Sequence, residues 1–184
     1  MDAITLLKSE HKAVEALFKR FESTGPSAHK TRAQVVGQVI EALSKHAAIE
    51  EQVFYPAVRA ALPSEEDTVL EALEEHHVVK WTLSELEGMA PEDERFTAKV
   101  TVLMESVRHH VDEEEQELFP AVRQALGRRR LGEIGEAIEA ARRLAPPRPH
   151  PRAPDTPPGN LVAGLAAGAV DTVAKAGRRL VGRK

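Results

Sequence analysis

The sequence predicts an all-α protein: an up-down-up-down four-helix bundle with a short extra C-terminal helix and a proline-rich tail. In four long segments apolar residues recur every three or four positions, the period of a helix that buries one face. Short stretches with Gly or Pro separate the segments, and short loops join antiparallel neighbours. The third observation is a repeat, because the seventeen residues from His46 return sixty-four positions later, from His110, with ten identities.

Each expected helix has local signals at its ends. Asp2 and Ser64 are suited to cap the first and third helices, since a short polar side chain can accept a bond from a free backbone N–H. Pro56 is expected to bend the second helix, and a glycine ends the third and the fourth. The four expected helices span about residues 2–25, 27–61, 64–88 and 91–127.

The chain beyond the bundle divides into three parts. Residues 128–144 have the pattern of an additional helix, weakened by two glycines and expected to pack outside the bundle. Residues 145–160 are proline-dense and predict an extended linker. Residues 161–184 form an Ala/Gly-rich basic tail, whose composition fits a disordered segment or a weak amphipathic helix on a membrane surface or a protein partner. Residues 1–127 are expected to form one domain.

Composition excludes several classes of function. The chain has no cysteine, so a metal can be held by nitrogen and oxygen alone. Residues 1–144 carry eighteen Lys or Arg against twenty-seven Asp or Glu, which argues against nucleic-acid binding through the core. Residues 145–184 carry seven basic against two acidic residues, so only the tail is basic. The N-terminus lacks the apolar region of a signal peptide, and a cytoplasmic location is expected.

The repeat contains a histidine followed four residues later by a glutamate, as His46 with Glu50 and His110 with Glu114. In a helix this spacing puts both side chains on one face, where they can bind one metal ion. A carboxylate has two oxygens, so two such pairs that face each other can hold two bridged metals. The repeat therefore predicts a dinuclear site.

Two further histidines share the apolar face of their helices. His11 and His76 have apolar residues at helical spacing, whereas the same offsets from His77 reach polar residues. The repeat selects His110 over His109, because only His110 keeps register with Glu114. One such histidine alone would be read as a core residue, and one His/Glu pair as a surface hydrogen bond. Together they favour a metal site, whose predicted ligands are His11, His46, Glu50, His76, His110 and Glu114.

In this order the six residues resemble the metal-binding motif of the hemerythrin-like (HHE cation-binding) family. Within that family the chain is most similar to the actinobacterial branch. The resemblance covers about residues 1–127 and implies two iron ions in a non-haem centre with an oxo or hydroxo bridge. Glu50 and Glu114 would bridge the irons. Histidine and carboxylate also accept manganese, zinc and copper, so iron is implied by the resemblance alone.

The chain departs from the oxygen-carrying hemerythrins at two positions. Lys80 stands where their third helix has a second histidine, and Glu115 stands where their fourth helix has an aspartate. Fewer protein ligands leave more open metal positions. They favour reaction with peroxide, nitric oxide or dioxygen, as in a di-iron oxidoreductase, over simple oxygen transport. The alternative is a module that binds or senses oxygen or iron reversibly. Tyr55, the sole tyrosine, is expected to be a packing residue unless a bend turns it toward Glu50, and no catalytic residue is assigned.

Overall fold

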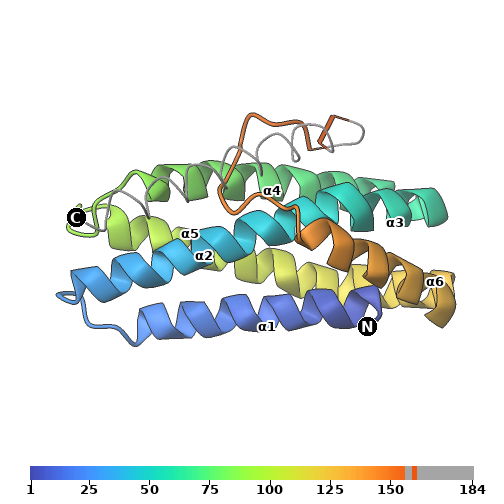
Figure 1. Cartoon of the computed structure of the whole chain (residues 1–184), viewed down its shortest axis with the longest axis horizontal. Coiled ribbons are helices and arrows are strands. Elements are labelled where there is room, and N and C mark those ends of the chain that lie inside the picture. Colours follow the sequence, from blue (N-terminus) through green and yellow to red (C-terminus); the bar gives the residue numbers. More distant parts are fainter. Residues whose placement is uncertain (156–158, 161–184) are drawn as a thin grey trace.

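A computed structural model of the protein describes residues 1–155 and 159–160, which form a bundle of long antiparallel helices (Figure 1). Consecutive helices run up, down, up and down, as predicted, and the described residues contain no β-strand. The second and fourth long helices each contain one wide π-helical turn. In chain order the elements are α1 (Ala3–Glu22), α2 (His29–Ile49), π-turn η1 (Glu50–Phe54), α3 (Tyr55–Ala61), 3₁₀ turn η2 (Pro63–Glu65), α4 (Glu66–Glu87), α5 (Phe96–Glu113), π-turn η3 (Glu114–Leu118) and α6 (Phe119–Arg142).

The helix ends agree with the sequence signals in part. The Asp2 carboxylate accepts a bond of 2.9 Å from the Thr5 backbone N–H, so Asp2 caps α1. Gly88 ends α4 as expected. Ser64 is not an N-cap, because it lies within η2 and α4 begins without a side-chain cap. The fourth helix begins at Phe96, five residues after Pro91.

The interior consists of two apolar clusters, one toward each end of the bundle. One contains Leu7, Val58 and Leu73, and the other contains Phe18, Val39 and Leu83. On every long helix a histidine lies in sequence between the residues of the first cluster and those of the second. The predicted ligands therefore occupy one polar layer between two apolar layers.

The π-turns stand at equivalent places in the repeat, immediately before a Tyr-Pro or Phe-Pro dipeptide. The backbone N–H of Tyr55 bonds to the carbonyl of Glu50, and that of Phe119 bonds to the carbonyl of Glu114, which are five residues back rather than four. Proline lacks an N–H and its ring clashes with the carbonyl four residues earlier, so widening the preceding turn relieves the clash. The expected distortion is thus real but lies before Pro56.

The additional helix is part of the core, which corrects the expectation that it packs outside the bundle. Gly127 has φ 66° and ψ 172°, so the chain turns sharply within α6 at the glycine where the fourth helix was expected to end. Beyond this kink the buried side chains of Leu131, Ile134 and Ile138 join Ala3 in one apolar cluster. The last part of α6 thereby closes the bundle at the start of α1.

Residues 143–155 contain no helix and lie over α2 and α4 (Figure 1). Asn160 is buried and donates from its amide to the Glu51 carbonyl over 2.9 Å and to the Asp155 carbonyl over 3.0 Å, which connects the end of this segment to η1. The tail predicted for residues 161–184 lies outside the described residues. None of the helices in the described ranges is long and apolar enough to cross a bilayer.

Two glycines of α6 provide a test of this closure. A Cβ on Gly135 would lie 2.2 Å from the Met1 carbonyl oxygen, whereas a Cβ on Gly132 would meet nothing within 4 Å. We expect Gly135→Ala to lower the free energy of unfolding by about 1–3 kcal/mol through overpacking. Gly132→Ala should raise it by about 0.5–1 kcal/mol, because alanine favours the helix. Urea unfolding measures both, and equal effects of the two substitutions would contradict the close contact.

Candidate metal centre

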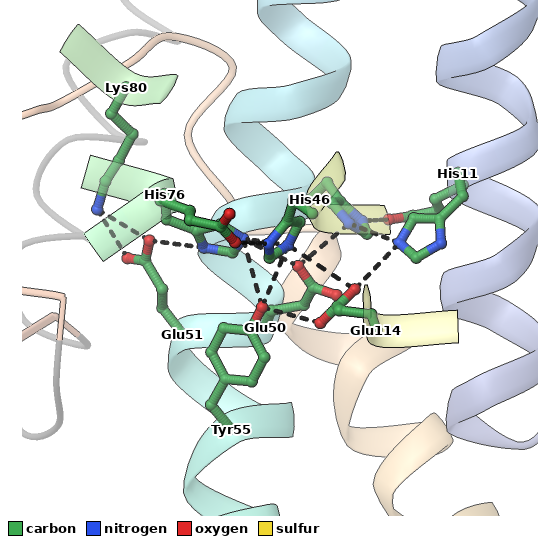
Figure 2. A network of polar contacts seen from close by, with 11 residues as sticks. His11, His46, Glu50, Glu51, Tyr55, His76, Lys80 and Glu114 are labelled. Carbon is green, nitrogen blue, oxygen red and sulfur yellow. Dashed lines mark hydrogen bonds and ion pairs between the residues drawn. The ribbon is translucent and has the colours of Figure 1, made fainter. Parts of the chain in front are cut away.

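The six predicted ligands converge in the polar layer. Figure 2 labels His11, His46, Glu50, His76 and Glu114, whose side chains point toward one another. They come from all four long helices, and each of the six is at most 5% exposed. Two overlapping groups have potential ligand atoms within 4.8 Å of one another, and Glu50 belongs to both groups. These groups are His11, His46, Glu50 and Glu114, and Glu50, His76 and His110.

The imidazoles form two pairs. The Nε2 atoms of His11 and His46 are 3.2 Å apart, and those of His76 and His110 are 3.1 Å apart. Each glutamate reaches one histidine of each pair. Glu50 Oε2 lies 3.1 Å from His46 Nε2 and 3.4 Å from His76 Nε2. Glu114 Oε2 lies 3.4 Å from His11 Nε2 and 3.8 Å from His110 Nε2.

A second ring of carboxylates surrounds the imidazoles, and sequence reasoning missed it. Every Nδ1 atom contacts a carboxylate oxygen that lies farther from the centre. The signal was present, because Glu10 and Glu75 directly precede an inward histidine, and Glu51 and Glu115 directly follow an inward glutamate. The four contacts are His11 with Glu115 at 2.9 Å, His46 with Glu10 at 3.0 Å, His76 with Glu51 at 3.2 Å and His110 with Glu75 at 2.7 Å.

This ring determines the tautomer of each neutral imidazole. An ionised carboxylate only accepts hydrogen bonds, so each Nδ1 must carry the proton and donate it. Each Nε2 then presents a lone pair to the centre. Four lone pairs therefore meet the carboxylates of Glu50 and Glu114 in a buried space, an arrangement that is repulsive unless a cation lies between them.

Three of the four oxygens of the inner carboxylates lack other partners. Both Glu50 oxygens and Glu114 Oε2 are buried and have no hydrogen-bond donor. The spacing of the nitrogens also suits a metal, because two nitrogens bound at about 2.1 Å and at right angles lie about 3.0 Å apart. The residues thus fit two cations, one at each histidine pair, with Glu50 and Glu114 between them. Nitrogen and oxygen donors accept iron, manganese, zinc or copper.

Tyr55 reaches the centre because of the π-turn. In a regular helix it would point about 140° away from Glu50, but the extra residue of η1 reduces this angle to about 40°. Tyr55 is buried, as expected of a packing residue, and its hydroxyl also donates to Glu114 Oε1 over 2.9 Å. Its counterpart in the repeat, Phe119, stacks on the ring of His11 at 5.8 Å. The two halves of the site therefore differ chemically at this position.

Burial and mutual repulsion shift the titration of the centre. Burial raises the pKa of Glu50 well above its usual value, and the negative charge of Glu114 raises it further. Burial alone would also raise the pKa of Glu114, but the neighbouring imidazoles, first His110 and then His11, lower it to about 2. Burial lowers the pKa of His46 to about 4, so this imidazole is neutral at pH 7 and available as a ligand.

The two positions that depart from the oxygen carriers lie outside the inner ring. Lys80 is buried and its Nζ lies 2.9 and 3.1 Å from the Glu51 carboxylate oxygens, beside His76 (Figure 2). Glu115 binds His11 and, over 3.0 Å, Lys8. The positions of His77 and His109 agree with the sequence analysis, since both lie outside the buried cluster.

Comparisons with known proteins agree with this architecture. The hemerythrin HHE cation binding domain matches residues 2–122. An uncharacterized hemerythrin-like protein of Schizosaccharomyces pombe is 30% identical over 163 residues, which cover 88% of this chain and 79% of that protein. A DNA nickase of a Nostoc species is 28% identical over 142 residues, which cover 77% of this chain and 39% of that protein.

The fold is also similar to a solved structure. The crystal structure of a hemerythrin HHE cation binding domain-containing protein from Mycobacterium kansasii matches with a TM-score of 0.67 and 24% identity, over 78% of this chain and 86% of that one. At this identity the likeness supports the fold. The match of the domain to residues 2–122, together with the 30% identity to the Schizosaccharomyces pombe protein, shows that the chain belongs to the hemerythrin HHE cation-binding domain family.

Proposed function

We propose that the protein holds a carboxylate-bridged di-iron centre that reacts with a small oxidant, namely peroxide, nitric oxide or dioxygen. The observation that carries this proposal is the convergence of four Nε2 lone pairs on two buried carboxylates, three of whose four oxygens lack a hydrogen-bond donor. Iron bound there would supply redox chemistry and vacant positions for an oxidant.

The chain's own residues would hold and shape this centre. His11 with His46, and His76 with His110, would bind one metal each, and the outer carboxylates would orient the four rings. Glu50 and Glu114 would bridge. With two nitrogens and two carboxylate oxygens per metal, the protein would leave coordination positions free on both. These free positions favour reaction with an added ligand. They are consistent with the presence of Lys80 where the oxygen-carrying hemerythrins have a histidine.

Other side chains would exclude water and fix the bridges. Phe54 and Phe119 are fully buried and pack edge to face, 5.5 Å apart, within the apolar cluster on the α6 side of the centre. The Tyr55 hydroxyl holds Glu114 in place. The pKa of Tyr55 is raised well above its usual value by burial and then by the charge of Glu114, so the hydroxyl keeps its proton and remains a donor.

Loading tests the ligand set. We expect the wild-type chain to bind two iron ions, and the double variant Glu50→Gln and Glu114→Gln to bind none, because an amide is a poor bridging ligand. Elemental analysis after anaerobic loading measures the stoichiometry. The control is Glu117→Gln, which changes an exposed glutamate three residues after Glu114 and should leave two ions bound. Full loading of the double variant would refute these residues as ligands.

Reactivity tests the function itself. When peroxide or nitric oxide is added anaerobically to iron-loaded protein, we expect the absorption spectrum to change, with gas evolution if peroxide is dismutated. A spectrum that responds to neither reagent would refute reaction with small oxidants. Reversible oxygenation, with the reduced spectrum restored by deoxygenation and no iron lost, would instead establish the binding module as the function.

The metal-free protein should show the cost of the buried Glu50 carboxylate. The pKa of Glu50 is raised by burial, so its contribution to stability is present below its unfolded value near 4.5 and is lost as pH rises through the folded pKa. Relative to Glu50→Gln, the free energy of unfolding of the wild type should fall by up to about 1.4 kcal/mol per pH unit between pH 4.5 and the folded pKa of Glu50. Urea unfolding of both proteins in chelator from pH 4.5 to 8 measures this difference. A constant difference across that range would contradict the raised pKa.

A further inference from the structure

Two cavities lie on the same side of the candidate metal centre. The larger is a groove of about 550 Å³ between α1 and α5, with Lys12, Glu15 and Arg108 among the residues that line it. His11 and Glu115 also line this groove, so it reaches the outer face of the site. The smaller cavity, of about 20 Å³, is bounded by all four histidines and by apolar side chains that include Leu43 and Val79.

One layer of side chains separates these two spaces. Four residues line both of them: His11, Val14, Val107 and Val111. Val14 and Val107 are buried, whereas Val111 is partly buried at the edge of the apolar cluster. Movement of one valine side chain would therefore connect the groove with the space in front of the imidazoles.

The opposite side of the site is more enclosed, because the cavity that borders Glu51 and Lys80 there has a volume of about 40 Å³ and none of the four histidines lines it. There the outer carboxylate Glu51 and its partner Lys80 have side chains only 6% and 9% exposed, and Asn160 binds the Glu51 backbone. The equivalent pair on the groove side, Glu115 and Lys8, is 27% and 38% exposed. The two sides of this nearly symmetric site thus differ, because the side with the α1–α5 groove is open and the side with Glu51 and Lys80 is more enclosed.

Given the proposed di-iron centre, on which this inference rests, we infer that the α1–α5 groove is the route by which the oxidant enters, and that Val111 and Val107 gate the last step into the small cavity. A cavity of about 20 Å³ is little larger than one that holds a water molecule. Its walls beyond the imidazoles are apolar, and they disfavour charge. The route therefore selects uncharged molecules of one or two heavy atoms, such as dioxygen, nitric oxide or hydrogen peroxide, and excludes organic hydroperoxides.

The metal-free protein provides the first test. Dissolved dioxygen is paramagnetic and speeds the relaxation of nearby methyl signals, so the Leu43 methyl groups report its entry into the small cavity. We expect Val111→Phe to reduce this effect several-fold. The matched control, Val102→Phe, places the same side chain on the exposed face of α5 and should leave the effect unchanged. Equal effects in both variants would overturn the route, whether or not the protein binds iron.

The iron-loaded protein provides the second test, in stopped-flow measurements of nitric oxide association. Val111→Ala and Val107→Ala should each raise the association rate constant several-fold, because they thin the shared layer. Val79→Ala removes the same atoms from the wall of the small cavity but does not border the groove, and it should leave the rate constant unchanged. A larger increase in Val79→Ala than in both other variants would place the entrance elsewhere. Failure to load iron would instead refute the proposed function and leave the first test decisive for the route.

Discussion

The structure depends on negative charge and lone pairs gathered in the middle of an apolar bundle. Four imidazoles turn their unprotonated nitrogens inward because four outer carboxylates bind the protonated ones. Three of these outer carboxylates are balanced by a cation, namely Lys8, Lys80 or Arg142, but Glu50 and Glu114 have none. The interior therefore lacks positive charge beside these two carboxylates, and a metal cation bound there would supply it.

The π-turns show how a helix can turn more side chains toward a site than its regular period allows. Glu50 and Glu114 begin these turns. The residue after each turn, Tyr55 or Phe119, faces the site instead of the outer side of the bundle. A proline stands at the equivalent position after each turn, Pro56 or Pro120, so both copies of the repeat contain the distortion. The repeat is then broken by one hydroxyl, since Tyr55 donates to Glu114 while Phe119 stacks on His11. A nearly symmetric scaffold thus holds two unequal halves.

Much of this arrangement could be read from the sequence, and the physical reasons differ by feature. Helical periodicity predicted the bundle and selected His76 over His77, because burial on one face is a local property of a helix. The register of the repeat selected His110 over His109. The wide turns could not be foreseen, since proline permits a kink, a bend or a π-turn equally. The outer carboxylates were missed because Glu10 and Glu75 serve histidines on other helices, and such pairings depend on how the helices are rotated against each other. For the same reason the sequence left open which histidines pair.

The packing of α6 on the beginning of α1 affects when the site can be completed during synthesis. Ala3 and the first turns of α1 are covered by Ile134 and Ile138, which leave the ribosome more than a hundred residues later. The helix that bears His11 therefore has an uncovered apolar end until α6 has been synthesised. Metal would be acquired after α6 has docked on the start of α1, rather than by a shorter nascent chain.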